Sequence, residues 1–139
     1  MRKVMRPRYY CEHCRKGSGS AYHMKKHEAG CTLNPERVCG MCKVVGNDQP
    51  NLGTLMALLP TVEQQKETHE YGGDYFRDID ERVVRELRKA AGECPACMMA
   101  AIRQRGLPVP TACGFNFTEE CKRVWSDFNN AQYEREYHY

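Results

Sequence analysis

Residues 9–31, YYCEHCRKGSGSAYHMKKHEAGC, carry the pattern that decides the fold of this chain. Four metal-ligating side chains stand in it at the spacing C-x2-C-x12-H-x3-C, namely Cys11, Cys14, His27 and Cys31. A C-x2-C pair lets two sulfur atoms of one tight turn bind the same ion, and an H-x3-C pair places two ligands on one helix face. Thiolates and an imidazole in a set of four are typical of tetrahedral zinc. The stretch therefore predicts a structural zinc site.

Two further C-x2-C pairs supply four more thiolates. Cys39 and Cys42 enclose Gly-Met, and Cys94 and Cys97 enclose Pro-Ala. Glycine favours a tight turn and proline favours the start of a helix, so both pairs are typical of metal-binding turns. The 51 residues between the two pairs exceed the roughly 15 to 20 of a compact zinc ribbon, so an insertion has to bridge them. We predict a second zinc site with four cysteine ligands.

The first stretch resembles the Cys2His2 zinc-finger family, in the variant with Cys as the last ligand, from Tyr9 to Cys31. Tyr9 stands where that family places an aromatic residue, and Met24 where it usually places Leu. Ser18 departs from the family pattern, because a Phe normally packs there beneath the helix. The resemblance therefore implies a finger with a thin miniature core that depends on contacts with neighbouring residues.

The same resemblance implies which side chains would face nucleic acid. The base-reading positions of the family fall on Ser20, His23 and Lys26. Fingers normally read DNA in tandem and this chain contains one, so we expect contact with phosphates more than base reading. The predicted nucleic-acid surface comprises Arg8, Arg15, Lys16, Ser20, Tyr22, His23, Lys25 and Lys26. The competing interpretation is a basic, solubilising face that contacts only water.

Two other ways of pairing the metal ligands remain open at this point. His23 lies four residues before His27, so a site made of Cys11, Cys14, His23 and His27 would leave Cys31 free. The order of the ligand pairs also resembles the cross-braced RING family. That arrangement would place Cys11, Cys14, Cys39 and Cys42 on one ion, and His27, Cys31, Cys94 and Cys97 on the other. The x12 and x3 spacings favour the sequential arrangement.

Charge is unevenly distributed along the chain. Residues 1–45 hold 10 Lys or Arg against 3 Asp or Glu, and residues 46–139 hold 11 against 15. Seven thiolates and two Zn²⁺ ions lower the formal net charge from +3 to about zero, so attraction to nucleic acid has to be local. An odd count of nine cysteines favours the reducing cytoplasm over a disulfide framework. No stretch approaches the ~18 apolar residues of a membrane span.

Hydrophobic spacing predicts a mostly α fold with short β-hairpins at the metal-binding turns. Helices are predicted over 52–59, from 61 onwards, and over 78–91, 95–104 and 118–136, and strands at 8–10, 38 and 44–45. Thr61 and Gln64 have the spacing of a capping box for the second of these helices, and residues 71–74 are predicted as a loop. We expect residues 1–34 to form a basic arm and finger, and residues 35–139 a helical domain with the second zinc site. A chain of 139 residues with a mean hydropathy of −0.74 buries a lean core, so folding should depend on its two structural zinc ions.

The last predicted helix carries an apolar stripe. Its members recur at helical spacing and predict a face that packs on the core, made of Phe117, Cys121, Val124, Trp125 and Phe128. Cys113 and Cys121 lie outside every predicted ligand pair. We expect both to be small buried apolar residues, as free cysteines often are.

Catalysis is not expected, because four protein ligands fill each predicted site and leave no position for a substrate. The Cys pairs that flank an insertion are similar to those of HNH-type nucleases, but His69 lacks the second His and the Asn of that family. We predict a non-enzymatic regulatory or accessory protein that binds DNA or RNA through the basic finger. The alternative is a protein-binding adaptor or inhibitor that uses its helices and the tyrosine-rich tail at 133–139. The chain is also similar to small zinc proteins of tailed bacteriophages, which implies a host-directed role.

Overall fold

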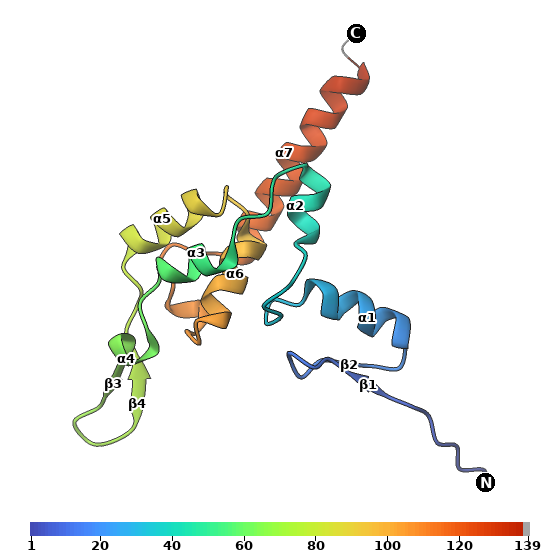
Figure 1. Ribbon diagram of the computed structural model, residues 1–139, viewed down its shortest axis with the longest axis horizontal. Helices are drawn as coiled ribbons and strands as arrows, with labels where there is room; N and C mark the ends of the chain where they lie inside the picture. The colour runs from blue at the N-terminus through green and yellow to red at the C-terminus, as the bar shows by residue number, and fades with distance from the viewer. Residues whose placement is uncertain (138–139) are drawn as a thin grey trace.

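The computed structural model describes residues 1–137, and its helices make up about half of that stretch (Figure 1). Two small antiparallel hairpins supply the named strands of the described residues. Two compact clusters of Cys and His side chains lie within this framework. The predicted fold class is therefore confirmed, since the protein is a small, mainly helical fold stabilised by two zinc sites. The last two residues of the tyrosine-rich tail, 138–139, lie outside the described residues.

The N-terminal finger begins with a hairpin of two short strands. Strand β1 (Tyr9–Tyr10) pairs antiparallel with β2 (Gly17–Ser18), with Tyr10 opposite Gly17. A Cβ atom added at Gly17 would lie 2.8 Å from Cε1 of Tyr10, so the ring packs directly over the glycine backbone. The amide of Cys11 donates to the carbonyl of Lys16 at 2.9 Å and closes the turn between the strands. The first C-x2-C pair is thereby held in a tight loop.

Helix α1 (Ala21–Gly30) follows and completes the finger. Ser20 is its N-cap, and the hydroxyl of Ser20 accepts a hydrogen bond from the amide of His23 at 3.3 Å. Met24 is buried with two of the cysteines in a separate small core, against which Leu33 packs. The predicted thin core is present, and residues after the last ligand contribute to it.

The larger core lies around helix α6 (Pro95–Gln104), which packs against α3 (Leu52–Ala57), α5 (Glu81–Ala90) and α7 (Phe117–Tyr137). The bounds of α6 match the prediction. The most deeply buried large side chains of this core are Leu55, Ile79, Val84, Leu87, Met98 and Ile102. All four cysteines of the second metal cluster belong to the same core. The 3-10 turn η1 (Val109–Thr111) and a parallel bridge between Ile79 and Ala112 cover its edge.

The insertion between the second and third Cys pairs contains a hairpin that the sequence did not reveal. Helix α4 (Val62–Gln65) starts with the predicted capping box of Thr61 and Gln64. It leads into β3 (Lys66–Thr68), which pairs antiparallel with β4 (Asp74–Phe76). Residues 71–73 of the loop expected at 71–74 belong to the turn of this hairpin, where Gly72 and Gly73 adopt positive φ, and Asp74 is already the first residue of β4. The hairpin projects from the body (Figure 1).

Two predicted strands are wrong, because valine propensity was overridden by tertiary context. Val44 and Val45 lie in helix α2 (Gly40–Val45), which starts at the second Cys pair, and Val38 is not in a named strand. The second hairpin is also remote from the metal-binding turns in sequence. Short β-structure therefore accompanies only the first of the two clusters in the described residues.

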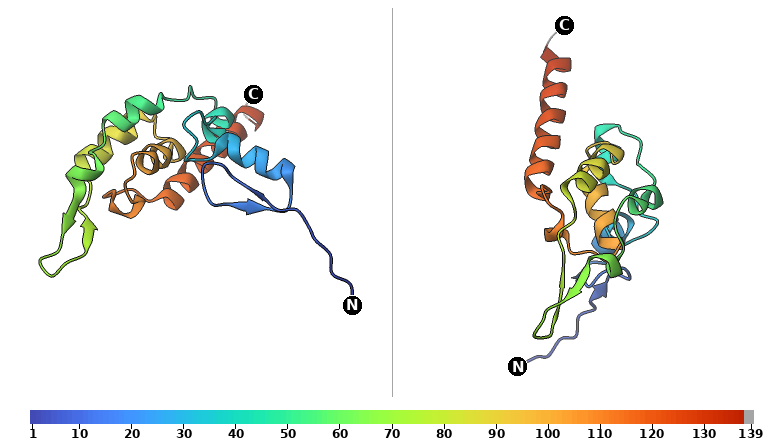
Figure 2. Two further views of the ribbon diagram at one scale, coloured as in Figure 1. Left: turned by 60° about the horizontal axis from the view of Figure 1, so that its bottom comes forward. Right: turned by 90° about the vertical axis from the view of Figure 1, so that its left-hand side faces the viewer.

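Helix α7 is the longest element of the described residues, and its C-terminal half extends beyond the other elements (Figures 1 and 2). Its first turn is anchored by Glu120, which is 8% exposed at its side chain and pairs with Arg88 at 2.8 Å. The predicted core stripe on this helix is partly wrong, because Trp125 remains 36% exposed. Cys113 and Cys121 are half-buried and not fully buried. A helix that extends beyond the elements it packs against cannot bury its whole apolar face.

Candidate metal centres

The first centre gathers its ligands from the β1–β2 turn and from α1 and the residue that follows it. The ligand atoms of Cys11, Cys14, His27 and Cys31 all lie within 4.8 Å of one another, and we call this cluster the finger centre. Sγ of Cys14 lies 3.2 Å from Nε2 of His27, so the imidazole presents that nitrogen to the cluster. A tetrahedral zinc ion with bonds of about 2.0 to 2.3 Å places neighbouring N and S ligands roughly 3.6 Å apart. The arrangement fits a structural zinc site with three sulfur ligands and one nitrogen ligand.

Backbone amides support the sulfurs of the finger centre. The amide of His13 donates to Sγ of Cys11, and the amide of Lys16 donates to Sγ of Cys14, each at 3.4 Å. The hydrogen bond from Lys16 is the main cause that lowers the pKa of Cys14 to about 7. Burial raises the pKa of Cys31. The turn therefore favours the thiolate at Cys14, which is the form that binds zinc.

The second centre lies inside the larger core. The sulfurs of Cys39, Cys42, Cys94 and Cys97 lie within 4.8 Å of one another, and all four residues are buried; we call this cluster the four-cysteine centre. Cys39 and Cys94 are 3.6 Å apart at sulfur, and Cys42 and Cys97 are 3.7 Å apart. A tetrahedron with Zn–S bonds of about 2.3 Å has edges of roughly 3.8 Å, whereas a disulfide measures about 2.05 Å. The arrangement fits a structural zinc site with four thiolate ligands.

Both pairs of the four-cysteine centre sit at the starts of helices. Cys39 is the N-cap of α2, and its sulfur accepts from the amide of Cys42 at 3.4 Å. Cys94 is the N-cap of α6, and Pro95 occupies the first turn, where its missing amide hydrogen costs no helical bond. The positive end of the α6 dipole therefore points toward the thiolates. Both C-x2-C pairs lie at helix starts, which the sequence indicated for the Pro-Ala pair, whereas the Gly-Met pair was predicted only as a tight turn.

The thiols of the four-cysteine centre do not ionise independently. Hydrogen bonding from Cys94 lowers the pKa of Cys39, whereas burial raises the pKa of Cys42 to about 12. The pKa of Cys97 is raised, chiefly because it donates to Cys39. One buried thiolate thus suppresses the ionisation of its neighbours. Four thiolates at this position require a divalent cation, and zinc is the ion that such a tetrahedral sulfur set favours.

The structure distinguishes between the ways of pairing the ligands. The two clusters follow the sequential arrangement, and the cross-braced one is wrong, because Cys39 and Cys42 meet Cys94 and Cys97. His23 is exposed and belongs to neither cluster, and its ring packs edge-on against Tyr22 at 5.5 Å. Cys31 is the buried fourth ligand of the finger.

The predicted nucleic-acid residues occupy the surface of the finger, with one exception. Ser20 is half-buried and committed to capping α1, so its hydroxyl is engaged by the helix. The exposed members are Arg8, Arg15, Lys16, Tyr22, His23, Lys25 and Lys26. Arg8 lies over the ring of Tyr10, with 6.0 Å from its guanidinium carbon to the ring centroid. Across residues 1–137, none of these basic side chains has an Asp or Glu oxygen within 4.0 Å.

Two residues near the four-cysteine centre were missed by sequence reasoning. Oε1 of Gln49 accepts from the amide of Cys39 at 2.6 Å, and its Nε2 donates to the carbonyl of Arg37 at 2.9 Å. Nη1 of Arg37 reaches Sγ of Cys97 at 3.7 Å. Neither residue lies in a motif. Gln49 stands ten residues after Cys39 and Arg37 two residues before it, and an isolated polar side chain gives no periodic signal. Such outer contacts orient metal ligands and tune their basicity.

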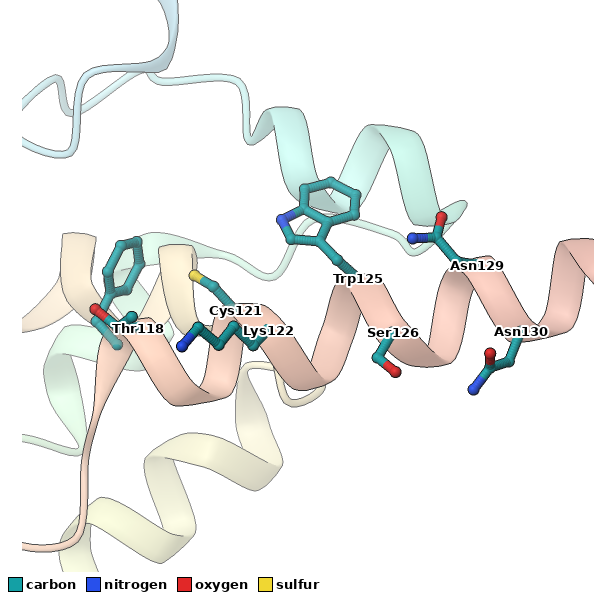
Figure 3. Close-up of a pocket in the computed structure, with 8 residues that line it drawn as sticks. Thr118, Cys121, Lys122, Trp125, Ser126, Asn129 and Asn130 are labelled. Atoms are coloured by element: carbon teal, nitrogen blue, oxygen red, sulfur yellow. The ribbon is translucent and has the colours of Figure 1, made fainter.

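A shallow surface on α7 collects the residues of the predicted stripe that the core leaves uncovered. Figure 3 shows Trp125 and Cys121 on one side of this helix, with Ser126, Asn129 and Asn130 further along it. Phe117 and Thr118 line the same surface near the start of the helix. The surface mixes an exposed indole with amides and hydroxyls, a composition common in protein interfaces.

Comparisons of the chain with protein-family models, with curated proteins and with solved structures found no match. Within residues 1–137, no helix combines the length and the apolar character needed to cross a membrane. The chemistry of the two clusters therefore carries the functional assignment. The chain is a zinc-binding protein with two structural sites, the finger centre and the four-cysteine centre.

Proposed function

We propose that this protein is a non-enzymatic regulatory or accessory factor of the cytoplasm that binds DNA or RNA through the basic face of its finger. The observation that carries the proposal is the set of exposed Lys and Arg side chains that have no carboxylate partner in the described residues. Residues 1–34 hold 8 Lys or Arg against 2 Asp or Glu, a formal charge of +6. Three thiolates and one Zn²⁺ lower this by one, to +5. Phosphates are the natural counter-charges for such a surface.

One of the two acidic residues of the finger, Glu28, supports this interpretation. Glu28 is half-buried, and its Oε1 accepts from the amide of Glu12 at 3.1 Å. This carboxylate is therefore engaged with the turn that carries Cys11 and does not pair with a nearby lysine. The basic side chains of α1 remain available to a ligand. Both zinc sites have four protein ligands, which is typical of structural zinc and favours a binding function over a catalytic one.

Lys25 and Lys26 test the proposal most directly, because both are exposed on α1 and neither is a metal ligand. The double variant Lys25→Ala/Lys26→Ala should weaken binding of the zinc-loaded protein to random single-stranded and duplex DNA and RNA. The salt slope of log K should fall in magnitude by about 1.4 to 1.8 for two lost phosphate contacts. Fluorescence anisotropy between roughly 50 and 200 mM salt measures both effects.

Arg82→Ala/Arg85→Ala on the exposed side of α5 is the matched control, since it removes the same charge from a helix remote from the finger (Figure 1). An equal loss of affinity in both double variants would mean that binding depends only on net charge and that the finger is not the binding surface. Absence of binding by the wild-type protein at the lowest salt would contradict the proposal outright.

A second candidate function is that of a protein-binding adaptor or inhibitor, including the host-directed role that a phage protein would have. Its specific support is the uncovered part of α7, where Trp125 is 36% exposed and Tyr133 is 59% exposed. Large aromatic side chains of this kind often anchor interfaces. This helix also extends past the body, so a partner can reach it without contacting the finger (Figure 2).

Trp125→Ala should leave zinc content unchanged, because the indole lies outside both metal clusters, and should lower thermal stability without unfolding the protein, because the indole is partly packed. Affinity for a protein partner isolated with the wild-type chain should drop by about 2 kcal/mol or more if Trp125 anchors the contact. Isothermal titration measures that loss, with Tyr71→Ala at the tip of the β3–β4 hairpin as a control for an exposed aromatic residue elsewhere. An unchanged affinity in Trp125→Ala would remove α7 from consideration.

A further inference from the structure

Arg37 is a buried cation in the connector between the two zinc centres, by which we mean residues 32–38, between the last ligand of the finger centre and the first ligand of the four-cysteine centre. The residue is 7% exposed, although arginine is rarely buried without a partner. Its Nε lies 3.5 Å from the carbonyl oxygen of Gly30 at the end of α1, and its Nη1 lies 3.7 Å from Sγ of Cys97. One planar side chain thus contacts the last turn of the finger helix and a ligand of the four-cysteine centre.

The surroundings of Arg37 supply no carboxylate. In residues 1–137, no Asp or Glu oxygen lies within 4.0 Å of this guanidinium. A buried charge without a counter-charge is strongly unfavourable. Neutral thiols do not compensate it, whereas four thiolates around one Zn²⁺ carry a net negative charge. The donor set that fits zinc therefore also supplies the counter-charge of Arg37.

The part of the connector before Arg37 is held against α6, the helix that carries Cys97. Nε2 of Gln104 donates to the carbonyls of Thr32 and Asn34 at 2.8 and 2.9 Å. Nη1 of Arg103 donates to the hydroxyl of Thr32 at 2.6 Å. Cys97 lies near the start of α6, and Gln104 is its last residue. The finger is thus tied to both ends of the helix that holds the second metal.

We propose that Arg37 is a positioning residue that couples the two zinc centres. Its charge stabilises the zinc-bound thiolates of the four-cysteine centre, and its hydrogen bond to Gly30 fixes the finger helix against that centre. Loss of the ion from the four-cysteine centre lowers the negative charge that faces the guanidinium and loosens the last turn of α1, next to the ligand Cys31. The finger therefore retains its own zinc better when the four-cysteine centre is loaded. This coupling does not depend on whether the protein binds nucleic acid.

Arg37→Met removes the charge and keeps most of the apolar stem, so it tests both roles together. Zinc release from the full-length protein to a chromophoric chelator should become about 10-fold faster or more at the four-cysteine centre, the usual effect of losing an outer contact of a metal ligand. Release from the finger centre should also accelerate. Substitution of both ions by ¹¹³Cd assigns each event, because a site with four sulfur ligands and a site with three sulfurs and one nitrogen give separate resonances. Arg85→Met, on exposed α5, is the matched control.

Arg37→Lys separates the two roles and keeps the test informative if Arg37→Met does not fold. An ammonium group retains the charge but cannot contact Gly30 and Cys97 with two ends of one planar group. We expect it to restore retention at the four-cysteine centre while the finger still releases its ion faster than wild type. The role of Arg37 as a counter-charge would be overturned if Arg37→Met released zinc from the four-cysteine centre at the same rate as Arg85→Met. The coupling would be overturned if both Arg37 variants released the ion of the four-cysteine centre faster than wild type but released the ion of the finger centre at the wild-type rate.

Discussion

Cys42→Ser is expected to abolish zinc binding at the four-cysteine centre and to unfold the helical part of the molecule. Cys42 is 2% exposed, and all four ligands of this centre are members of the larger core. Structural zinc sites carry apparent binding free energies of about 10 to 16 kcal/mol at neutral pH, which matches or exceeds the roughly 5 to 15 kcal/mol net stability of a typical domain. Loss of the ion also lowers the negative charge that compensates the buried Arg37.

The measurement is zinc content by atomic emission together with far-UV circular dichroism and thermal unfolding. Cys121→Ala is the matched control, because this half-buried cysteine lies on α7 outside both clusters. It should retain both ions and a cooperative transition. A folded Cys42→Ser protein that still carries two zinc ions would contradict the assignment of this ligand.

Cys14→Ser is expected to have the second-largest effect, confined at first to the finger. Cys14 is one of the half-buried ligands of the finger centre and the one whose pKa is lowered to about 7. The finger core consists of Met24, Cys11 and Cys31, with Cys14 and Leu33 packed against it, so little apolar burial remains once the ion is lost. We expect one zinc ion per chain, disorder of 9–31, and a helical part that is retained but less stable.

Amide-resolved NMR of the zinc-loaded variant distinguishes this outcome from global unfolding. Resonances of α5 and α6 should stay dispersed, while those of α1 collapse toward random-coil positions. His23→Ala serves as the control, since this exposed histidine is not a ligand and its removal should leave two ions bound. Retention of two ions by Cys14→Ser, or loss of one by His23→Ala, would reverse the choice of finger ligands.

Local features of the fold followed from the sequence because they depend on neighbours within a few residues. The periodic apolar pattern from Pro95 to Gln104 matches α6, and the Thr61 and Gln64 pair forms the capping box that its spacing indicates. The hairpin β3–β4 was not visible, because its strands are three residues long and carry Lys66, Glu67 and Asp74, residues that strands do not favour. Cross-strand pairing, with ion pairs and the stacked rings of His69 and Tyr75, holds them together.

The sequence by itself determined the donor chemistry, because C-x2-C and H-x3-C spacings bring ligands together within one turn of chain. Only the tertiary structure decided which pair meets which across 51 residues, and that Trp125 on α7 stays partly exposed. It also decided that Arg37, with no motif around it, lies between the two centres. The physical reason is that each of these features depends on how helices distant in sequence pack on one another, whereas the spacing of residues fixes only what lies within a turn.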